Sequence, residues 1–197
     1  MKPDATTINV YDSKVTEYQN LSIDVVQDRR LKQFANTLPK NATVLDYGCG
    51  PGEAAAYFAE RGMHAHAFDA STEMVALARR HSLVKVWQAG FHDFNAVDTY
   101  DGVWASFSLL HAPRSDMRGL LVTINKSLKA NGKFCISVKL GSGEARDALG
   151  RLYTYYQHEE LEVLLATAGF TWESHLNGSS KGLDGSTSDW ISIFAHA

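Results

Sequence analysis

The first stretch of the chain whose residue types could hold a ligand is the segment 46–52, Asp-Tyr-Gly-Cys-Gly-Pro-Gly. Its alternating glycines, Gly48 and Gly50 among them, let the backbone turn sharply and let a bound molecule approach it closely. An apolar run precedes the segment and a helical pattern follows it, so the free N–H groups of a helix would face the turn. We therefore predict a ligand-binding turn between a strand and a helix, although a tight structural connection alone would also use glycines.

A second candidate is Asp69, which stands 19 residues after Gly50 at the end of another β-like run. An acid at this distance from a glycine-rich turn can accept hydrogen bonds from both hydroxyls of a ribose. The alternative is that Asp69 only supports the turn before Ser71, a residue type that caps helices well. Together with the glycine-rich turn, Asp69 favours a ligand that carries a ribose.

A third candidate is His111, which lies in the segment 106–114 just beyond a predicted strand. Because the unperturbed pKa of imidazole is near neutrality, His111 could take a proton from a hydroxyl, a thiol or an amine. It could equally hydrogen-bond to the loop backbone with no part in catalysis. In either case we expect His111 to border the ligand site.

A fourth candidate is the polar, glycine-rich run that begins at Lys139 and includes Arg146 and Tyr153. The two cations could bind an anionic ligand, and the tyrosine could stack on it or donate a hydrogen bond to it. The alternative is an ordered surface loop whose tyrosines pack against the domain. We predict that Lys139, Arg146 and Tyr153 face the same pocket as the glycine-rich turn.

The elements that must position these residues alternate along the chain between short β-branched runs and longer helical patterns. Strands are predicted at residues 42–47, 64–69, 84–88, 100–105, 133–140, 170–175 and 190–195, and helices at 53–61, 71–80, 115–128 and 159–168. Alternation over the first five strands predicts a parallel sheet with right-handed crossovers. The last two strands are joined by a loop too short for a parallel crossover. One antiparallel strand is therefore expected near the sheet edge.

Composition limits the class of protein. The 197 residues are 45% hydrophobic and 21% charged, which fits a globular domain and not a disordered chain. The net charge of −3 lacks the basic excess of a general nucleic-acid binder. The two cysteines, Cys49 and Cys135, have no metal-ligand spacing, so we expect no metal site and reduced thiols in a cytoplasmic protein. No apolar stretch is long enough to span a membrane.

With these features the chain resembles the class I S-adenosylmethionine-dependent methyltransferases over residues 42–140. The resemblance rests on the Asp-x-Gly-x-Gly-x-Gly turn, on Asp69, on the fourth-strand segment 100–104 and on the turn 129–133. It implies an α/β fold: a Rossmann-like three-layer sandwich with a mostly parallel seven-stranded sheet and one antiparallel strand. It also implies an enzyme whose cofactor is S-adenosyl-L-methionine.

The resemblance assigns residues to the cofactor. Gly48 and Gly50 would lie under its methionine part, Asp46 would contact its amino group and Asp69 its ribose. Gly90 takes the place where many relatives have an acid beside adenine, so adenine would pack on Phe91 or on Trp87, unless a shifted register lets Asp93 serve. The expected cofactor-binding residues are Asp46, Gly48, Cys49, Gly50, Asp69, Ala70, Phe91 and Trp104.

Residues 1–40 precede the sheet and contain two helical patterns, one around Tyr11, Tyr18 and Leu21 and one at 23–38. We expect them across the carboxyl end of the sheet or on one face, with the tyrosines in a lid. Residues 1–197 then form a single methyltransferase domain with 41–197 as its core. The expected substrate-side residues are Tyr11, Tyr18, His111, Lys139, Arg146 and Tyr153, of which His111, Arg146 and Tyr153 are the candidates for catalysis.

Three functions compete. The first is methyl transfer to a small-molecule acceptor by in-line displacement. The second is methylation of tRNA or protein, which the negative net charge disfavours. The third is a nicotinamide-dependent oxidoreductase or a noncatalytic nucleotide-binding protein, but Glu53 stands where the dinucleotide pattern needs a glycine. The chain also resembles small bacterial methyltransferases labelled tellurite-resistance-like, and its tail loosely resembles enzymes that methylate wobble uridines in tRNA. The oligomeric state is not predicted.

Overall fold

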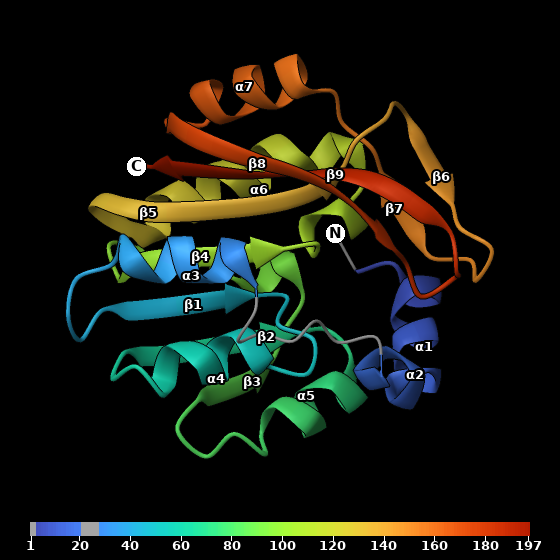
Figure 1. Ribbon diagram of the computed structural model, residues 1–197, viewed down its shortest axis with the longest axis horizontal. Helices are drawn as coiled ribbons and strands as arrows, with labels where there is room; N and C mark the ends of the chain where they lie inside the picture. Colours follow the sequence, from blue (N-terminus) through green and yellow to red (C-terminus); the bar gives the residue numbers. More distant parts are fainter. Residues whose placement is uncertain (1–2, 21–27) are drawn as a thin grey trace.

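A seven-stranded sheet is the centre of the computed structural model, which describes residues 3–20 and 28–197 (Figure 1). The strand order is β3-β2-β1-β4-β5-β9-β8. The strands are β1 (Thr43–Tyr47), β2 (His64–Asp69), β3 (Lys85–Gln88), β4 (Tyr100–Ser106), β5 (Leu128–Lys139), β8 (Thr171–Lys181) and β9 (Thr187–His196). All pairs from β3 to β5 are parallel, whereas β9 is antiparallel to both of its neighbours. The predicted α/β fold, with one antiparallel strand in a seven-stranded sheet, is confirmed.

Helices cover both faces of the sheet, because successive strand residues point to opposite sides. Val44 packs in a core with α3 (Arg29–Asn36) and α4 (Glu53–Ala59), and the next residue, Leu45, packs in a core with α6 (Arg114–Ser127) and α7 (His158–Thr167). The fifth helix, α5 (Thr72–Ala78), packs beside β2 and β3. The three layers expected of a Rossmann-like sandwich are therefore present.

The first two helices, α1 (Ala5–Ser13) and α2 (Val15–Asn20), lie at the carboxyl ends of the strands, at the right of Figure 1. The expected helical patterns of the segment 1–40 thus occupy both predicted places, since α3 covers a face. Leu21 and the part of the second pattern before Asp28 lie outside the described residues. No helix in the described ranges is long and apolar enough to cross a membrane.

The connection between the last two strands differs from the sequence-based expectation of a long loop over 176–189. Instead, β8 and β9 extend to Lys181 and Thr187, and a short turn joins them in which Gly182 N–H donates to Ser186 O at 2.8 Å. The outer part of this hairpin is polar and shows no alternation of apolar residues, since backbone pairing and not burial holds it.

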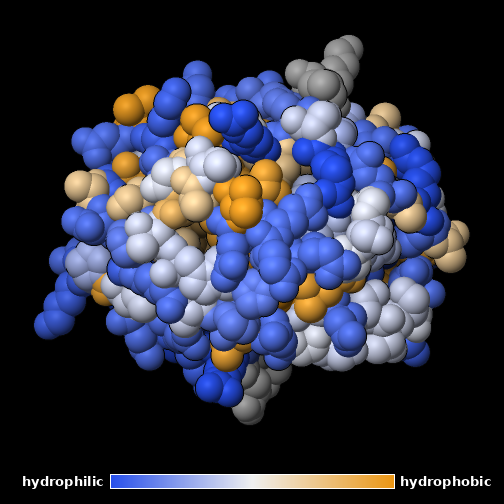
Figure 2. Space-filling view, turned by 90° about the horizontal axis from the view of Figure 1, so that it is seen from above, coloured by the Kyte–Doolittle hydropathy of each residue, from blue (hydrophilic) through white to orange (hydrophobic). Residues whose placement is uncertain are grey.

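The face of the molecule seen in Figure 2 is mostly hydrophilic, with small separate apolar patches.

The two glycines at the ends of α4 share a backbone conformation but differ in packing, so substitutions at them distinguish backbone strain from packing strain. Gly52 (φ +84°) and Gly62 (φ +79°) both have left-handed backbones. A Cβ on Gly52 would lie 2.8 Å from Ala78 Cβ on α5, whereas no described atom lies within 4 Å of a Cβ on Gly62.

We predict that Gly62→Ala lowers the free energy of unfolding by about 1–2 kcal/mol through backbone strain. Gly52→Ala should lose about 1–3 kcal/mol more, because α5 must also move away from the turn. Urea denaturation of both variants measures the difference. Equal losses would show that α5 does not pack tightly against this turn.

Candidate active site

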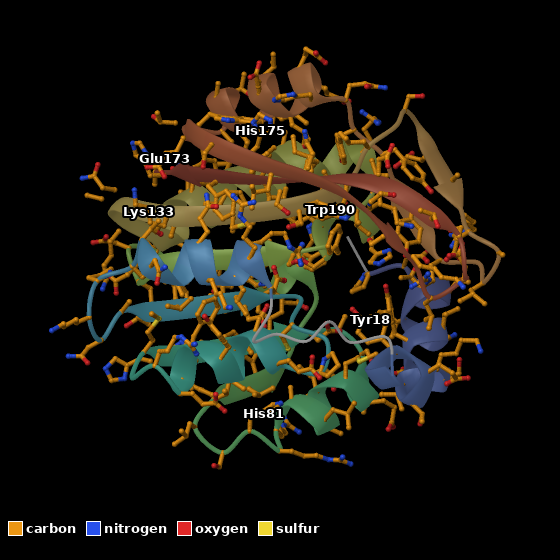
Figure 3. The ribbon with its side chains drawn as sticks, in the orientation of Figure 1. Tyr18, His81, Lys133, Glu173, His175 and Trp190 are labelled. Carbon is orange, nitrogen blue, oxygen red and sulfur yellow. The ribbon has the colours of Figure 1, made fainter. Side chains whose placement is uncertain are left out.

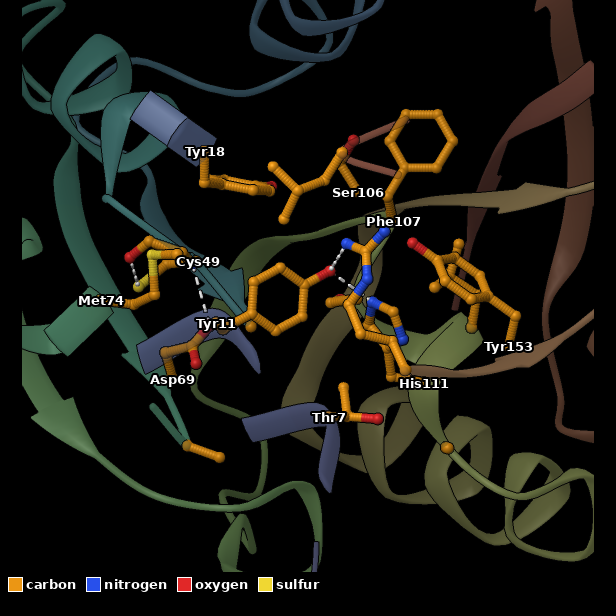
Figure 4. A pocket seen from close by; sticks show the side chains of 18 of the residues that line it. Thr7, Tyr11, Tyr18, Cys49, Asp69, Met74, Ser106, Phe107, His111 and Tyr153 are labelled. Carbon is orange, nitrogen blue, oxygen red and sulfur yellow. Dashed lines mark hydrogen bonds between the residues drawn. The ribbon is translucent and has the colours of Figure 1, made fainter. Parts of the chain in front are cut away.

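A cavity of about 360 Å³ opens at the carboxyl ends of β1, β4 and β5, beneath α1 (Figure 4). This size is within the range of small-molecule sites. Predicted site residues that line it are Tyr11, Tyr18, Asp46, Gly48, Cys49, Gly50, Asp69, Ala70, Phe91, Trp104, His111, Lys139 and Tyr153. Figure 3 labels Tyr18 on α2 and also Trp190 on β9, a cavity residue that the sequence did not single out. In the described part of the chain, no group of three or more His, Cys, Asp or Glu residues could hold a metal ion.

The glycine-rich turn forms one end of the cavity. Gly48 has φ +74°, and a Cβ there would lie 2.5 Å from Ser108 Cβ, so only glycine fits. The Asp69 carboxylate accepts from Gly50 N–H at 2.9 Å and from Ser71 N–H at 2.9 Å. Asp69 therefore fixes the turn and also faces the cavity, so the two roles that the sequence left open for it are compatible.

Two carboxylates, buried Asp46 and half-buried Asp69, make this end of the cavity negative. Asp46 accepts from Ala55 N–H at 3.2 Å, and burial raises its pKa to about 7. Burial also raises the pKa of Asp69. Within the described ranges neither carboxylate forms an ion pair. Since burying a charge without a partner is unfavourable, this end suits a ligand that brings positive charge or hydrogen-bond donors.

Phe91 supplies a flat surface near the turn. It lines the cavity and stacks on Tyr47, with ring centroids 5.2 Å apart. Trp87, the alternative partner for adenine, packs instead on Phe68 at 5.6 Å and does not line the cavity. Asp93 is exposed and accepts from Gly90 N–H at 2.8 Å. Of the three residues considered for adenine, only Phe91 is placed to contact a ligand.

At the other end of the cavity, His111 is held by two hydrogen bonds. Its Nδ1 lies 2.6 Å from Leu152 O, which can only accept, so Nδ1 carries a proton. Its Nε2 lies 2.7 Å from the Tyr11 hydroxyl. Burial lowers the pKa of His111 to about 4, so near pH 7 the ring is neutral and Nε2 accepts from Tyr11. His111 thus bonds to the loop backbone and borders the cavity, as both interpretations of the sequence expected.

Arg151 is a buried cavity residue that the sequence analysis did not select. Its guanidinium pairs with Asp147 (Nη2–Oδ2 2.6 Å), donates to the Tyr11 hydroxyl at 3.0 Å, and lies 5.2 Å from the ring centres of Tyr11 and Tyr153. The four-residue spacing of Asp147 and Arg151 could have indicated their ion pair. It could not show that Arg151, which comes just before β7 (Leu152–Thr154), lines the cavity.

Arg146, which was expected in the pocket with Lys139 and Tyr153, lies outside the cavity. It is on β6 (Glu144–Arg146), opposite Leu152 of β7, and its exposed guanidinium pairs with Asp4 at 2.9 Å. All three residues of β6 are exposed, so this strand lies at the surface and leaves the Arg146 side chain in solvent. The position of Arg146 therefore gives no support to the catalytic role considered for it.

Arg30 is a second buried arginine at this end. It pairs with Asp28 at 2.6 Å, and its guanidinium lies 5.0 Å from the Phe107 ring and 5.1 Å from the Trp190 ring. A further Nη1 bond reaches Ser137 Oγ on β5 at 3.3 Å. These partners come from four separate segments, so sequence spacing could not reveal them.

The helix α1 connects the two ends of the cavity. Near its C-terminus, Asp12 accepts from Ser71 Oγ and from Glu73 N–H at the start of α5. Near its N-terminus, Thr7 Oγ accepts from Leu152 N–H at 2.9 Å. With Tyr11 bonded to His111, α1 spans the opening, which is the position expected of a lid.

A family model described as methyltransferase domain matches residues 21–175. No curated protein sequence matches the chain. Among solved structures, 1,6-didemethyltoxoflavin-N1-methyltransferase from Burkholderia thailandensis, solved with bound 1,6-didemethyltoxoflavin and S-adenosylhomocysteine, is 24% identical, with 100% of this chain and 92% of that chain covered and a TM-score of 0.72. A TehB-like S-adenosylmethionine-dependent methyltransferase from Corynebacterium glutamicum is 13% identical, with coverages of 93% and 95% and a TM-score of 0.69.

The [4+2]-cyclase SpnF has a TM-score of 0.78 at 18% identity, with coverages of 100% and 97%. These likenesses establish the fold, and the family match covers most of the chain. Together they confirm the resemblance and the enzyme class that the sequence indicated. The chain belongs to the methyltransferase domain family and has the fold of the S-adenosylmethionine-dependent methyltransferases.

Proposed function

We propose that this protein transfers a methyl group from S-adenosylmethionine to a small-molecule acceptor. The observation that carries the proposal is the single cavity beneath α1. It joins the glycine-rich turn and its two carboxylates to an end built from aromatic and cationic side chains. One end then holds the cofactor and the other holds the acceptor.

The residues at the turn fit the cofactor. Asp46 and Asp69 are acids without ion pairs in the described part of the chain, and S-adenosylmethionine brings an ammonium group, a sulfonium group and two ribose hydroxyls. Gly48 leaves no side chain between the turn and a ligand. When bound, the cofactor supplies a methyl group whose carbon accepts a lone pair from the acceptor, while the sulfur keeps the electrons of the broken bond.

The remaining residues align and shield the acceptor. Tyr11 and α1 cover the opening and exclude water, which strengthens the electrostatic interactions inside. Neutral His111 can take the proton that an acceptor O–H or N–H releases, once that group replaces the Tyr11 hydroxyl at Nε2. The base is then His111, oriented by the Leu152 carbonyl, and the proton ends on Nε2.

Several observations favour a small acceptor over tRNA or protein. The helix α1 spans the cavity, and the net charge is −3. The similar structure from Burkholderia thailandensis is, by its name, a methyltransferase that acts on a small molecule, 1,6-didemethyltoxoflavin. We also propose one domain over residues 1–197, with 1–40 as the lid segment, and a cytoplasmic location consistent with the free thiols Cys49 and Cys135.

The first test measures cofactor binding and then methyl transfer to candidate acceptors. Calorimetry should show binding of S-adenosylmethionine and S-adenosylhomocysteine but not of NAD. Purified protein should then release S-adenosylhomocysteine with a fraction of a metabolite pool and not with tRNA or protein. Tighter binding of NAD would reject the cofactor, and cofactor binding without methyl transfer to any pool would leave a noncatalytic or non-methylating use of this fold.

Asp69→Ala should weaken S-adenosylhomocysteine binding at least tenfold without unfolding the protein. It removes charge-assisted hydrogen bonds worth about 1.5–3 kcal/mol each. Asp189→Ala, at an exposed acid outside the cavity, is the control and should bind as wild type does. Wild-type affinity in Asp69→Ala would mean that Asp69 serves the turn alone.

Cofactor affinity should also depend on pH through Asp46. Its pKa in the folded protein is about 7, so the carboxylate that attracts a cationic ligand is lost as pH falls below this value. Affinity should rise with pH from 5.5 to 7.5, by up to about tenfold per unit on the acid side, while the α-amino group of the cofactor stays largely protonated. In Asp46→Asn the affinity should be lower and this dependence flatter. A wild-type affinity that is constant over the range would contradict the assignment of Asp46.

A further inference from the structure

The cavity is electrically divided. Two carboxylates, Asp46 and Asp69, lie at the glycine-rich turn. The cations Arg30, Lys139, Arg151 and Lys181 line the other end, where the acids Asp4 and Asp28 also line the cavity. Under the proposed function, on which this inference rests, the positive cofactor occupies the acidic end. The acceptor must then fit the basic end.

The charges of the two buried arginines are already neutralised. Arg30 pairs with Asp28 and Arg151 pairs with Asp147, each at 2.6 Å. Their remaining N–H groups bond to serines and to the Tyr11 hydroxyl. Neither arginine therefore leaves a free positive charge for the acceptor.

Lys139 is different. It stands at the end of β5, is partly buried, and forms no ion pair with any described residue. Its Nζ lies 4.1 Å from the ring centre of Tyr153. The nearby acid Asp184 accepts its hydrogen bonds from Ser186 N–H and Oγ. Burial lowers the pKa of Lys139, and the charges of Asp184 and Asp147 oppose this shift without cancelling it.

A continuous row of aromatic rings runs from the turn toward Lys139 (Figure 4). Tyr18 meets Tyr11 with ring centroids 5.5 Å apart, Tyr11 meets His111 at 5.4 Å, and His111 meets Tyr153 at 4.7 Å, all edge to face. Tyr18 Cε1 is the atom nearest to a Cβ placed on Gly50, at 3.6 Å, so the row begins at the turn. Rings in this arrangement present faces and edges that favour a flat π-system over a bulky aliphatic group.

We propose that the acceptor is a planar aromatic or heteroaromatic acid. Its negative group pairs with the Lys139 ammonium, its ring lies along the row from Tyr11 to Tyr153, and its reacting O–H or N–H faces His111. The oxygen or nitrogen would form a bond to the methyl carbon as the bond from that carbon to the cofactor sulfur breaks. The bond electrons would stay on the sulfur of S-adenosylhomocysteine, and the released proton would go to His111 Nε2. His111 stands between Tyr11 and Tyr153, so the reacting group and the anionic group belong to the same ring system.

Matched probes test the class of acceptor without knowledge of its identity. Each probe set holds a ring acid, its neutral amide and the saturated acid: 4-hydroxybenzoate, 4-hydroxybenzamide and cyclohexanecarboxylate, with parallel sets on pyridine and indole. Binding is measured by saturation-transfer NMR and calorimetry on wild-type protein saturated with S-adenosylhomocysteine. In at least one set the ring acid should bind about tenfold more tightly than both of its partners.

Two variants locate the effect. Lys139→Met should remove the preference for acid over amide, and Tyr153→Leu should reduce the preference for aromatic over saturated acid, while S-adenosylhomocysteine still binds both. Lys133→Met, near the other end of β5 where Lys133 pairs with Glu173 (Figure 3), is the matched control and should keep both preferences.

The outcomes separate this inference from the proposed function. Failure of wild type to bind S-adenosylhomocysteine would reject the proposed function itself. Cofactor binding together with amides as tight as acids, with a preference that survives Lys139→Met, or with no ring acid bound at millimolar concentration, would overturn the acceptor class alone.

Discussion

Negative charge buried at the carboxyl edge of a parallel sheet is the constraint on which the rest of the site depends. Asp69 accepts from the N–H groups of Gly50 and Ser71, so one carboxylate shapes the glycine-rich turn and also faces the cavity. Burial raises the pKa of Asp69 and of Asp46, which shows that neither charge is fully stabilised by the protein. A positively charged ligand that enters the cavity would stabilise the charged form of both carboxylates. Glycine is also required at position 48 of this turn, since a side chain there would collide with Ser108.

The helix α1 covers part of this edge and turns it into a cavity. Its Asp12 binds the start of α5 on the cofactor side, and its Thr7 and Tyr11 bind Leu152, His111 and Arg151 on the other side. The neutral state of His111 depends on this cover, because burial is the main cause of its lowered pKa. Opening of α1 would expose His111 and the cavity together.

Local features of the sequence predicted the strand, turn and helix around Gly48 and Gly50 and the place of Asp69 beside them. The glycine-rich turn and Asp69 depend on backbone geometry within a few residues, and the parallel sheet follows from alternating periodicities. The residues at the other end of the cavity were harder to predict from the sequence. Arg146 and Arg151 are equivalent by composition, but Arg146 lies exposed on β6, whereas Arg151, just before β7, is buried and pairs with Asp147. Arg30 is buried by partners on β4, β5 and β9. The outer end of the β8–β9 hairpin is polar on both faces, so no apolar period revealed how far the two strands extend.

A crystal structure of the protein with S-adenosylhomocysteine measures the central claim most directly. The account predicts that the ligand lies in the cavity beneath α1, with both ribose hydroxyls bonded to the Asp69 carboxylate, the amino group on the Asp46 side and the sulfur turned toward His111. A ligand bound outside this cavity, or one whose ribose hydroxyls do not contact Asp69, would contradict it.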